Sequence, residues 1–193
     1  IEINMNKLIM IIIFFLIGCN NSNKDVIYEE IDFFVDISLL SEKQIIDNNF
    51  YFNCPDQLNE VTKKEFNKIN ESIKNNQNSF LELDLIKVYG SDSNFGILIN
   101  KIIDKNVFKK IDESDYFEQI KNNFKSSKIA IGKYQHNNVR FNQVIISSDI
   151  MVVIKIIIDI NESFYQLDYL VPTLIYKDVL KSIESSIGSI KNK

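Results

Sequence analysis

The residues of this chain with the strongest potential for covalent or acid–base chemistry are Cys19, Cys54 and His136, which is the only histidine. A cysteine nucleophile needs a base beside it, and His136 lies in a Gln-His-Asn-Asn segment whose composition is typical of a turn. We therefore expect His136 to be a solvated turn residue and Cys54 to be a buried, unreactive thiol. The sequence predicts no catalytic residue, and we expect the protein not to be an enzyme.

The other side chains that could bind a metal or a cofactor are too few or wrongly spaced. A zinc site needs three or four ligands of the His and Cys type, more than Cys54 and His136 provide. Residues 92–96 match a calcium loop only in part, because the third acidic or amide ligand before the glycine and the distal Glu of that loop are missing. The segment therefore predicts a hairpin turn. The acidic pairs, Glu29 with Glu30 and Asp112 with Asp115, are expected on a solvated surface. No glycine-rich nucleotide loop occurs, and the sequence predicts neither a metal nor a cofactor.

The segment before Cys19 has the anatomy of a signal peptide. Lys7 supplies a positive charge, residues 8–17 are wholly apolar, and Gly18 is a small residue where a processing enzyme would cut. The apolar stretch is shorter than the about 20 residues that a membrane-spanning helix needs. A core helix is the alternative, but a helix that is apolar on all sides would need burial on all sides.

Residues 16–19, Leu-Ile-Gly-Cys, resemble the lipobox of bacterial lipoproteins. The resemblance implies that Cys19 receives a diacylglycerol thioether and becomes the mature N-terminus, and two acyl chains suffice for stable anchoring in a membrane. Residues 1–18 are then the signal peptide, of which residues 1–4 precede Met5 and are left out of the fold prediction. Residues 19–30 are expected to form a short polar tether, and residues 31–193 the folded domain.

The composition bounds the partners and the way in which the domain is held together. The net charge is −4, from 22 basic and 26 acidic residues. Nucleic-acid-binding domains are usually basic, so we expect no nucleic-acid partner. After Cys19 only Cys54 remains, so we expect no intrachain disulfide and a core held by packing alone.

The periodicity of apolar residues predicts groups of strands separated by helices. Residues 31–40 predict a strand or a packed extended arm, and residues 50–55 predict an aromatic strand that ends in proline. Three helices are predicted: one capped by Asp56 and running to Lys74, one over 115–125 capped by Ser114, and one capped by Thr173. The remaining strands are predicted as a hairpin, 81–89 with 95–103, and a four-strand meander, 129–135, 139–147, 151–160 and 164–171.

The fold class that follows is α+β, with one domain, an antiparallel sheet of about six strands and helices packed on it. Residues 151–158 are almost continuously apolar and predict a central strand covered on both faces. The next strand is predicted to turn Tyr165, Leu167, Tyr169 and Val171 to the core. The last helix is expected to cover the sheet with an apolar stripe comprising Tyr176, Val179, Leu180, Ile183, Ile187 and Ile190.

The order of these elements resembles the Mog1/PsbP-like fold, which includes DcrB-type envelope lipoproteins. Local similarities are Phe-x-Phe-x-Cys-Pro at 50–55, Tyr-x-Leu-Asp-Tyr-x-Val-Pro at 165–172 and Ser-Ile-Glu-Ser-Ser-Ile at 182–187. The resemblance implies a non-enzymatic protein that binds and stabilises larger assemblies or acts as an accessory factor.

Together these patterns predict a lipid-anchored protein of the bacterial cell envelope with a non-catalytic binding or accessory role and an envelope protein as its partner. The alternative is a lipid-anchored hydrolase or small-ligand carrier that uses a cleft between sheet and helices. A pocket lined by polar groups would favour the alternative, and a filled interior with an exposed apolar patch would favour the protein binder. A surface antigen would differ from that binder only in exposure and partner. Asn20 follows Cys19 in place of the Asp that commonly retains such lipoproteins at the inner membrane, which favours the outer membrane in a cell with two membranes.

Overall fold

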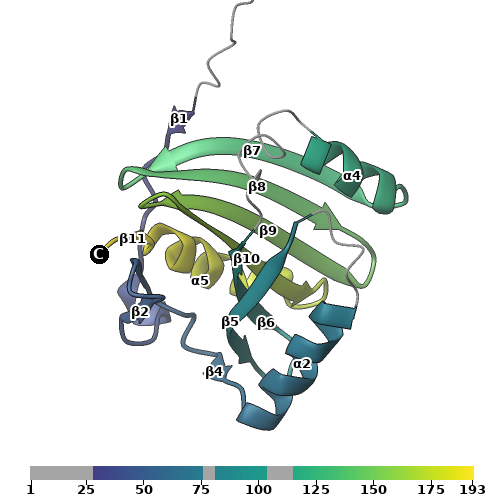
Figure 1. The fold of residues 1–193 in the computed structure, drawn as a ribbon, viewed down its shortest axis with the longest axis horizontal. Coiled ribbons are helices and arrows are strands. Elements are labelled where there is room, and N and C mark those ends of the chain that lie inside the picture. The colour runs from purple at the N-terminus through teal and green to yellow at the C-terminus, as the bar shows by residue number, and fades with distance from the viewer. Residues whose placement is uncertain (1–27, 76–80, 104–114) are drawn as a thin grey trace, which may run out of the picture.

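A computed structural model describes residues 28–75, 81–103 and 115–193 of the chain. The predicted signal peptide, Cys19 and the predicted cap Ser114 lie outside the described residues. A large twisted sheet forms the middle layer, with helix α5 (Tyr176–Gly188) behind it and helices α2 (Lys63–Asn75) and α4 (Asp115–Asn123) on the opposite face (Figure 1). The predicted α+β class is confirmed.

Four consecutive strands form the centre of the sheet. Each pairs antiparallel with the next, and two of the three turns are residue pairs with positive φ, Asn137-Asn138 and Asn161-Glu162. Positive φ at both central residues suits the tight hairpin turn whose twist matches that of the strands. The predicted meander is confirmed, and its strands are β7 (Lys128–His136), β8 (Val139–Ser147), β9 (Met151–Ile160) and β10 (Ser163–Pro172).

The predicted hairpin extends the sheet beyond β10. Strand β6 (Gly96–Ile102) pairs antiparallel with β10, and β5 (Leu83–Gly90) pairs with β6. Short strands complete the two edges, β4 (Asn59–Glu60) beside β5 and β1 (Glu29–Glu30) beside β7. The sheet therefore has eight strands in the order β1-β7-β8-β9-β10-β6-β5-β4, more than the six expected, and β1 is parallel to β7. The pair Glu29-Glu30, predicted as tether, thus belongs to the sheet.

A second, small sheet packs on the α5 side of the large one. It consists of β2 (Gln44–Ile46), β3 (Phe50–Phe52) and β11 (Lys191–Asn192). The aromatic strand predicted over 50–55 is confirmed as β3, with Phe50 and Phe52 fully buried. Residues 31–40 form a packed arm with a 3-10 turn, η1 (Ile37–Leu39), and one isolated bridge from Leu40 to Pro55.

Helix α2 begins six residues later than predicted: Asp56 does not cap it, and the helix starts at Lys63. The chain first forms β4 against β5. Thr62 and Glu65 then cap the helix reciprocally: the Glu65 N–H donates to Thr62 Oγ1 at 3.3 Å, and the Glu65 carboxylate accepts from the Thr62 N–H at 3.0 Å. This capping box satisfies two free helix-terminal groups at once, which a lone Asp does not.

Helix α4 lies where the sequence predicts it, but the start of α5 differs from the prediction. Thr173 does not cap α5, because its Oγ1 donates to the Ser148 carbonyl across the neighbouring turn at 3.0 Å. Ile175 occupies the cap position and makes no side-chain hydrogen bond there. The helix is stabilised mainly by its predicted apolar stripe, in which Val179, Ile183, Ile187 and Ile190 are buried.

The main core lies between the large sheet, α5 and the small sheet. The predicted core residues of β10, namely Tyr165, Leu167, Tyr169 and Val171, are all fully buried there. Strand β9 is central, but only one of its faces is continuously buried: Val152, Ile154, Ile156, Ile158 and Ile160. On its other face Ile157 is fully buried and Lys155 is only partly buried, so the prediction that both faces are covered holds only in part for this face. Within the described part of the chain, no helix is both long and apolar enough to cross a bilayer.

Candidate ligand-binding site

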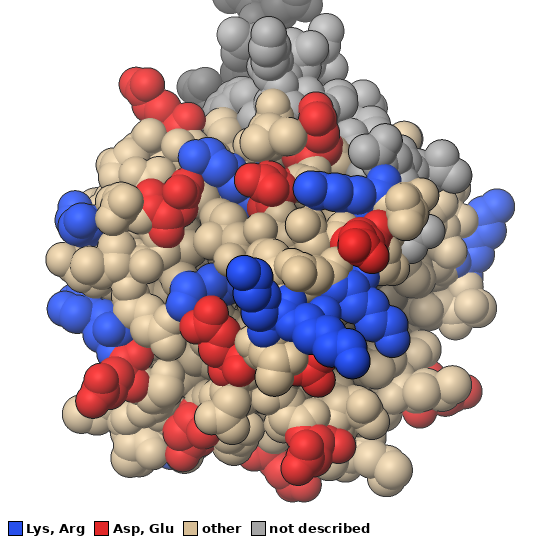
Figure 2. Space-filling view, turned by 60° about the horizontal axis from the view of Figure 1, so that its bottom comes forward, with Lys and Arg blue, Asp and Glu red and all other residues tan. Residues whose placement is uncertain are grey.

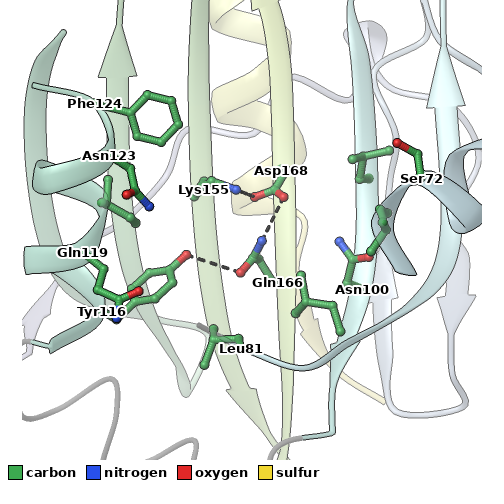
Figure 3. Close-up of a pocket in the computed structure, with 14 residues that line it drawn as sticks. Ser72, Leu81, Asn100, Tyr116, Gln119, Asn123, Phe124, Lys155, Gln166 and Asp168 are labelled. Carbon is green, nitrogen blue, oxygen red and sulfur yellow. Dashed lines mark hydrogen bonds and ion pairs between the residues drawn. The ribbon is translucent and has the colours of Figure 1, made fainter. Parts of the chain in front are cut away.

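A pocket of about 310 Å³ opens on the face of the sheet opposite α5, between α4 on one side and α2 on the other (Figure 3). Strands β9, β10 and β6 form its floor. Its apolar walls come from both helices and from the strands, and they comprise Ile73, Leu81, Leu83, Leu98, Ile120 and Phe124. Pockets for small molecules typically have this character, mostly apolar with a few placed polar groups.

The alternation of strand residues explains why polar groups gather on this floor. Tyr165, Leu167 and Tyr169 face the main core, so Gln166 and Asp168 between them face the pocket. Backbone register then sets their neighbours, because Asp168 lies opposite Lys155 of β9 and Gln166 lies opposite Asn100 of β6.

Three of these groups and Tyr116 of α4 form a continuous chain of hydrogen bonds (Figure 3). Lys155 Nζ donates to Asp168 Oδ1 at 3.0 Å, and Gln166 Nε2 donates to Asp168 Oδ2 at 2.8 Å. The Tyr116 hydroxyl donates to Gln166 Oε1 at 3.3 Å. Both oxygens of the Asp168 carboxylate are thus occupied, and its charge is balanced by Lys155.

At one end of this chain of hydrogen bonds, burial keeps the Tyr116 hydroxyl protonated. The pKa of Tyr116 is raised far above its usual value, chiefly by burial and further by the negative charge of Asp168. The hydroxyl therefore stays protonated and acts as a hydrogen-bond donor. Tyr116 in this way ties helix α4 to the floor of the pocket.

Asn100 stands apart from this chain. The residue is 1% exposed, and its Oδ1 is buried without a hydrogen-bond partner among the described residues. A buried acceptor without a partner costs about 1–3 kcal/mol of stability, and such groups in folded proteins call for a specific explanation. In Figure 3 Asn100 lies on the α2 side of the floor, beside Gln166. A bound molecule with an N–H or O–H group could supply the missing donor.

The side chains that line the pocket are better suited to binding a ligand than to covalent catalysis. The described lining contains no cysteine and no histidine, and the charges of Lys155 and Asp168 are committed to each other. Over residues 28–75, 81–103 and 115–193 no cluster of three or more metal-ligating side chains occurs.

Cys54 lies away from this pocket, in the main core. It is 1% exposed, and burial raises the pKa of its thiol to about 12. The prediction of a buried thiol is confirmed, and at neutral pH the reactive thiolate is scarcely populated.

His136 is not the solvated turn residue that the sequence predicts. It is the last residue of β7 and is 8% exposed, with Nδ1 2.8 Å from the Ile31 carbonyl oxygen and Nε2 3.1 Å from that of Gly188. The Phe33 ring meets it edge-on, at 5.1 Å between ring centroids. The arm that covers His136 is distant in sequence, so the polar residues around the histidine gave no sign of its burial.

The other candidates occupy ordinary structural positions or lie outside the described residues. Residues 92–96 form the hairpin turn that was predicted, closed by a hydrogen bond from the Ser91 N–H to the Phe95 carbonyl at 3.0 Å. Asp112 and Cys19 lie outside the described residues. The alternative hypothesis places a cleft between sheet and helices, but the residues that line the pocket were not predicted. One signal was present: Lys155 interrupts the apolar run of β9, and Gln166 and Asp168 alternate with core residues.

Surface charge does not point to a polyanion as the partner. On the face seen from the α2 end, basic side chains form a short band with acidic side chains on both sides (Figure 2). Several lysines are paired, namely Lys87 with Glu60, Lys101 with Asp47 and Lys181 with Asp36, at 2.8–2.9 Å. This face therefore lacks the single-sign field on which phosphate-backbone binding depends.

Comparison with known proteins gives a likeness of fold only. No protein-family model matches the sequence, and no curated protein matches it. The structure is similar to the solution structure of the cyanobacterial PsbP protein, CyanoP, from Synechocystis sp. PCC 6803, with 9% sequence identity and a TM-score of 0.46. The similarity covers 82% of this chain and 95% of that protein.

Proposed function

We propose that this protein is a lipid-anchored binding protein of the bacterial cell envelope that holds a ligand without transforming it. The binding role is supported by one observation above the others, the pocket whose floor carries a self-neutralised polar chain and an unpartnered Asn100 oxygen. The small-ligand carrier is thereby favoured over the hydrolase, because the described lining offers no thiol or imidazole for covalent or acid–base catalysis.

The proposed anchor is Cys19, which follows an apolar segment and the sequence Leu-Ile-Gly. Acylation there would hold the domain at a membrane surface. In a cell with two membranes, Asn20 favours the outer membrane. A protein of the envelope is the second candidate for the bound partner, and nucleic acid is not expected given the net charge of −4.

Fractionation of cells that carry Cys19→Ala tests the anchor. We expect the wild-type protein in the membrane fraction, labelled by exogenous palmitate, and the variant unlabelled and outside that fraction. Cys54→Ala is the matched control, because it removes the other thiol and should leave labelling and fractionation unchanged. Membrane retention of an unlabelled Cys19→Ala protein would overturn the proposal of a lipid anchor.

Crosslinking in intact cells tests the protein-partner candidate. A specific crosslinked partner whose recovery survives substitutions in the pocket would favour a protein binder over a small-ligand carrier. Loss of that partner on pocket substitution would instead connect the two roles.

A further inference from the structure

We infer that the pocket takes an uncharged, mainly apolar small molecule that donates one N–H or O–H hydrogen bond to Asn100 Oδ1. The inference rests on the proposed binding function and deepens it, since it names the class of ligand. Three features of the pocket carry it: its charge, its walls and the one fully buried acceptor without a partner among its described lining residues.

The charge of the floor excludes a strongly charged ligand. Lys155 and Asp168 lie 3.0 Å apart and neutralise each other, with side chains that are 21% and 8% exposed. An anion in the pocket would meet the Asp168 carboxylate and would have to draw Lys155 away from it. A cation would meet Lys155. Either exchange leaves a buried charge without its partner, which is strongly unfavourable.

The walls favour an apolar body of modest size. Six apolar side chains, from α2, α4, the strands and the residues directly beside them, line a volume of about 310 Å³. This volume is at the small end of the range for ligand pockets. One or two fused rings, or a short branched chain, would fill it.

The unpartnered acceptor specifies the polar group of the ligand. Asn100 lies between Gln166 on β10 and Leu85 on β5. Gln166 Nε2 donates to Asp168, and Leu85 has no side-chain donor. Asn100 Oδ1 receives no hydrogen bond from either of them or from any other described residue, and a ligand N–H or O–H would convert an unfavourable buried group into a hydrogen bond.

Three matched probes test the inference: indole, which is uncharged and has one N–H; 1-methylindole, which lacks that donor; and indole-3-acetate, which is an anion. Each is titrated by calorimetry into the full-length protein in lipid nanodiscs, with empty nanodiscs subtracted to remove partitioning into lipid. We expect indole to bind at least tenfold more tightly than either of the other two probes.

Two variants locate the effect. In Asn100→Leu the advantage of indole over 1-methylindole should fall to about one, because the acceptor is gone. Asn70→Leu is the matched control, since Asn70 Oδ1 is also buried without a partner but lies outside the pocket lining, and the advantage should persist.

The outcomes separate this inference from the proposed function. Equal binding of indole and 1-methylindole by the wild-type protein would overturn the donor requirement and leave a binding pocket. Tightest binding of indole-3-acetate would overturn the uncharged class. Absence of heat from all three probes would overturn small-ligand binding at this pocket, while the anchor would still be judged separately by fractionation. The ratio of the affinities for indole and 1-methylindole is measured on the wild-type protein, so it tests the donor requirement even if Asn100→Leu fails to fold.

Discussion

Substitution of Asn100 by leucine should make the unliganded protein more stable, although it changes a fully buried polar residue. The Asn100 side chain is 1% exposed, and its Oδ1 lacks a hydrogen-bond partner. Removing such a group relieves a penalty of about 1–3 kcal/mol. Leucine has a similar branched shape, and imperfect fit in a packed site costs up to about 1.5 kcal/mol.

The net expectation is a gain of about 1–2 kcal/mol in the free energy of unfolding. For a domain of this size, each kcal/mol corresponds to about 2–4 °C in Tm, so Tm should rise by about 2–8 °C. Urea denaturation followed by circular dichroism gives the free energy, and calorimetry gives Tm. An unchanged slope with urea would show that the extent of unfolding is the same in both proteins.

The control is the same substitution at Asn142, another buried asparagine on the same sheet. Asn142 is 7% exposed, and its Oδ1 accepts a hydrogen bond from the Tyr28 hydroxyl at 3.3 Å. Asn142→Leu should therefore lower stability by about 1 kcal/mol, since it removes an acceptor that has a partner. A loss of more than 1 kcal/mol in Asn100→Leu would refute the reasoning, because it would mean that the Asn100 amide makes stabilising hydrogen bonds.

Three further predictions concern groups outside the pocket. His136→Leu should lower the free energy of unfolding by about 2–4 kcal/mol, because the carbonyls of Ile31 and Gly188 lose their ring contacts, and amide exchange at residues 31–35 should become faster. Asp47 has a pKa below its usual value, mainly through the hydrogen bond from Lys101 and also through that from Tyr165, so its ionised form stabilises the fold. That contribution is present above the unfolded-state pKa of about 3.9 and is lost as pH falls through the lower folded-state pKa. Asp47→Asn should therefore cost up to about 1 kcal/mol at pH 7, with partial exposure limiting the effect, and urea titrations should show a progressively smaller cost as pH is lowered below the unfolded-state pKa. Cys54, whose thiol has a pKa of about 12 in its buried site, should react with an aromatic disulfide reagent at the rate of unfolding, and rapid reaction of the native protein would contradict its buried position.

The parts of the fold that the sequence predicts well are those determined by local patterns. Strands β7 to β10 alternate or run apolar between Asn-rich turns, and the structure has all four. The hairpin of β5 and β6 was predicted equally well, from the alternation of apolar and polar residues before Gly90 and from the largely apolar segment that begins at Phe95. In each case strand and partner are neighbours in sequence, so turn residues and periodicity carry the information.

The predictions that failed depend on contacts between distant segments. Asp56 has the chemistry of a cap, but residues 59–60 pair with β5 and delay helix α2 until Thr62 and Glu65 cap it. His136 has polar neighbours in sequence, yet the arm at Ile31 and Phe33 covers it. Neither the pairing of residues 59–60 with β5 nor the packing of the arm on His136 can be inferred from the local sequence.

The pocket was hidden for the same reason. Lys155, Asp168 and Asn100 meet because of the pairing of β9, β10 and β6, and Asn100 is 66 residues from its partner Gln166. The sequence around each of these residues predicts only a polar residue on the outer face of a strand. The pairing register of the three strands places them in one pocket.

The pairing of β1 with β7 fixes the start of the described chain at one edge of the large sheet. Tyr28, the first described residue, donates a hydrogen bond from its hydroxyl to Asn142 Oδ1 directly before β1. If Cys19 carries the proposed lipid, the eight residues 20–27 join it to Tyr28, and a fully extended chain over these nine residue steps spans at most about 30 Å. The domain would then stay within about 30 Å of the bilayer surface, and a molecule leaving the lipid would cross only a short aqueous distance to reach it.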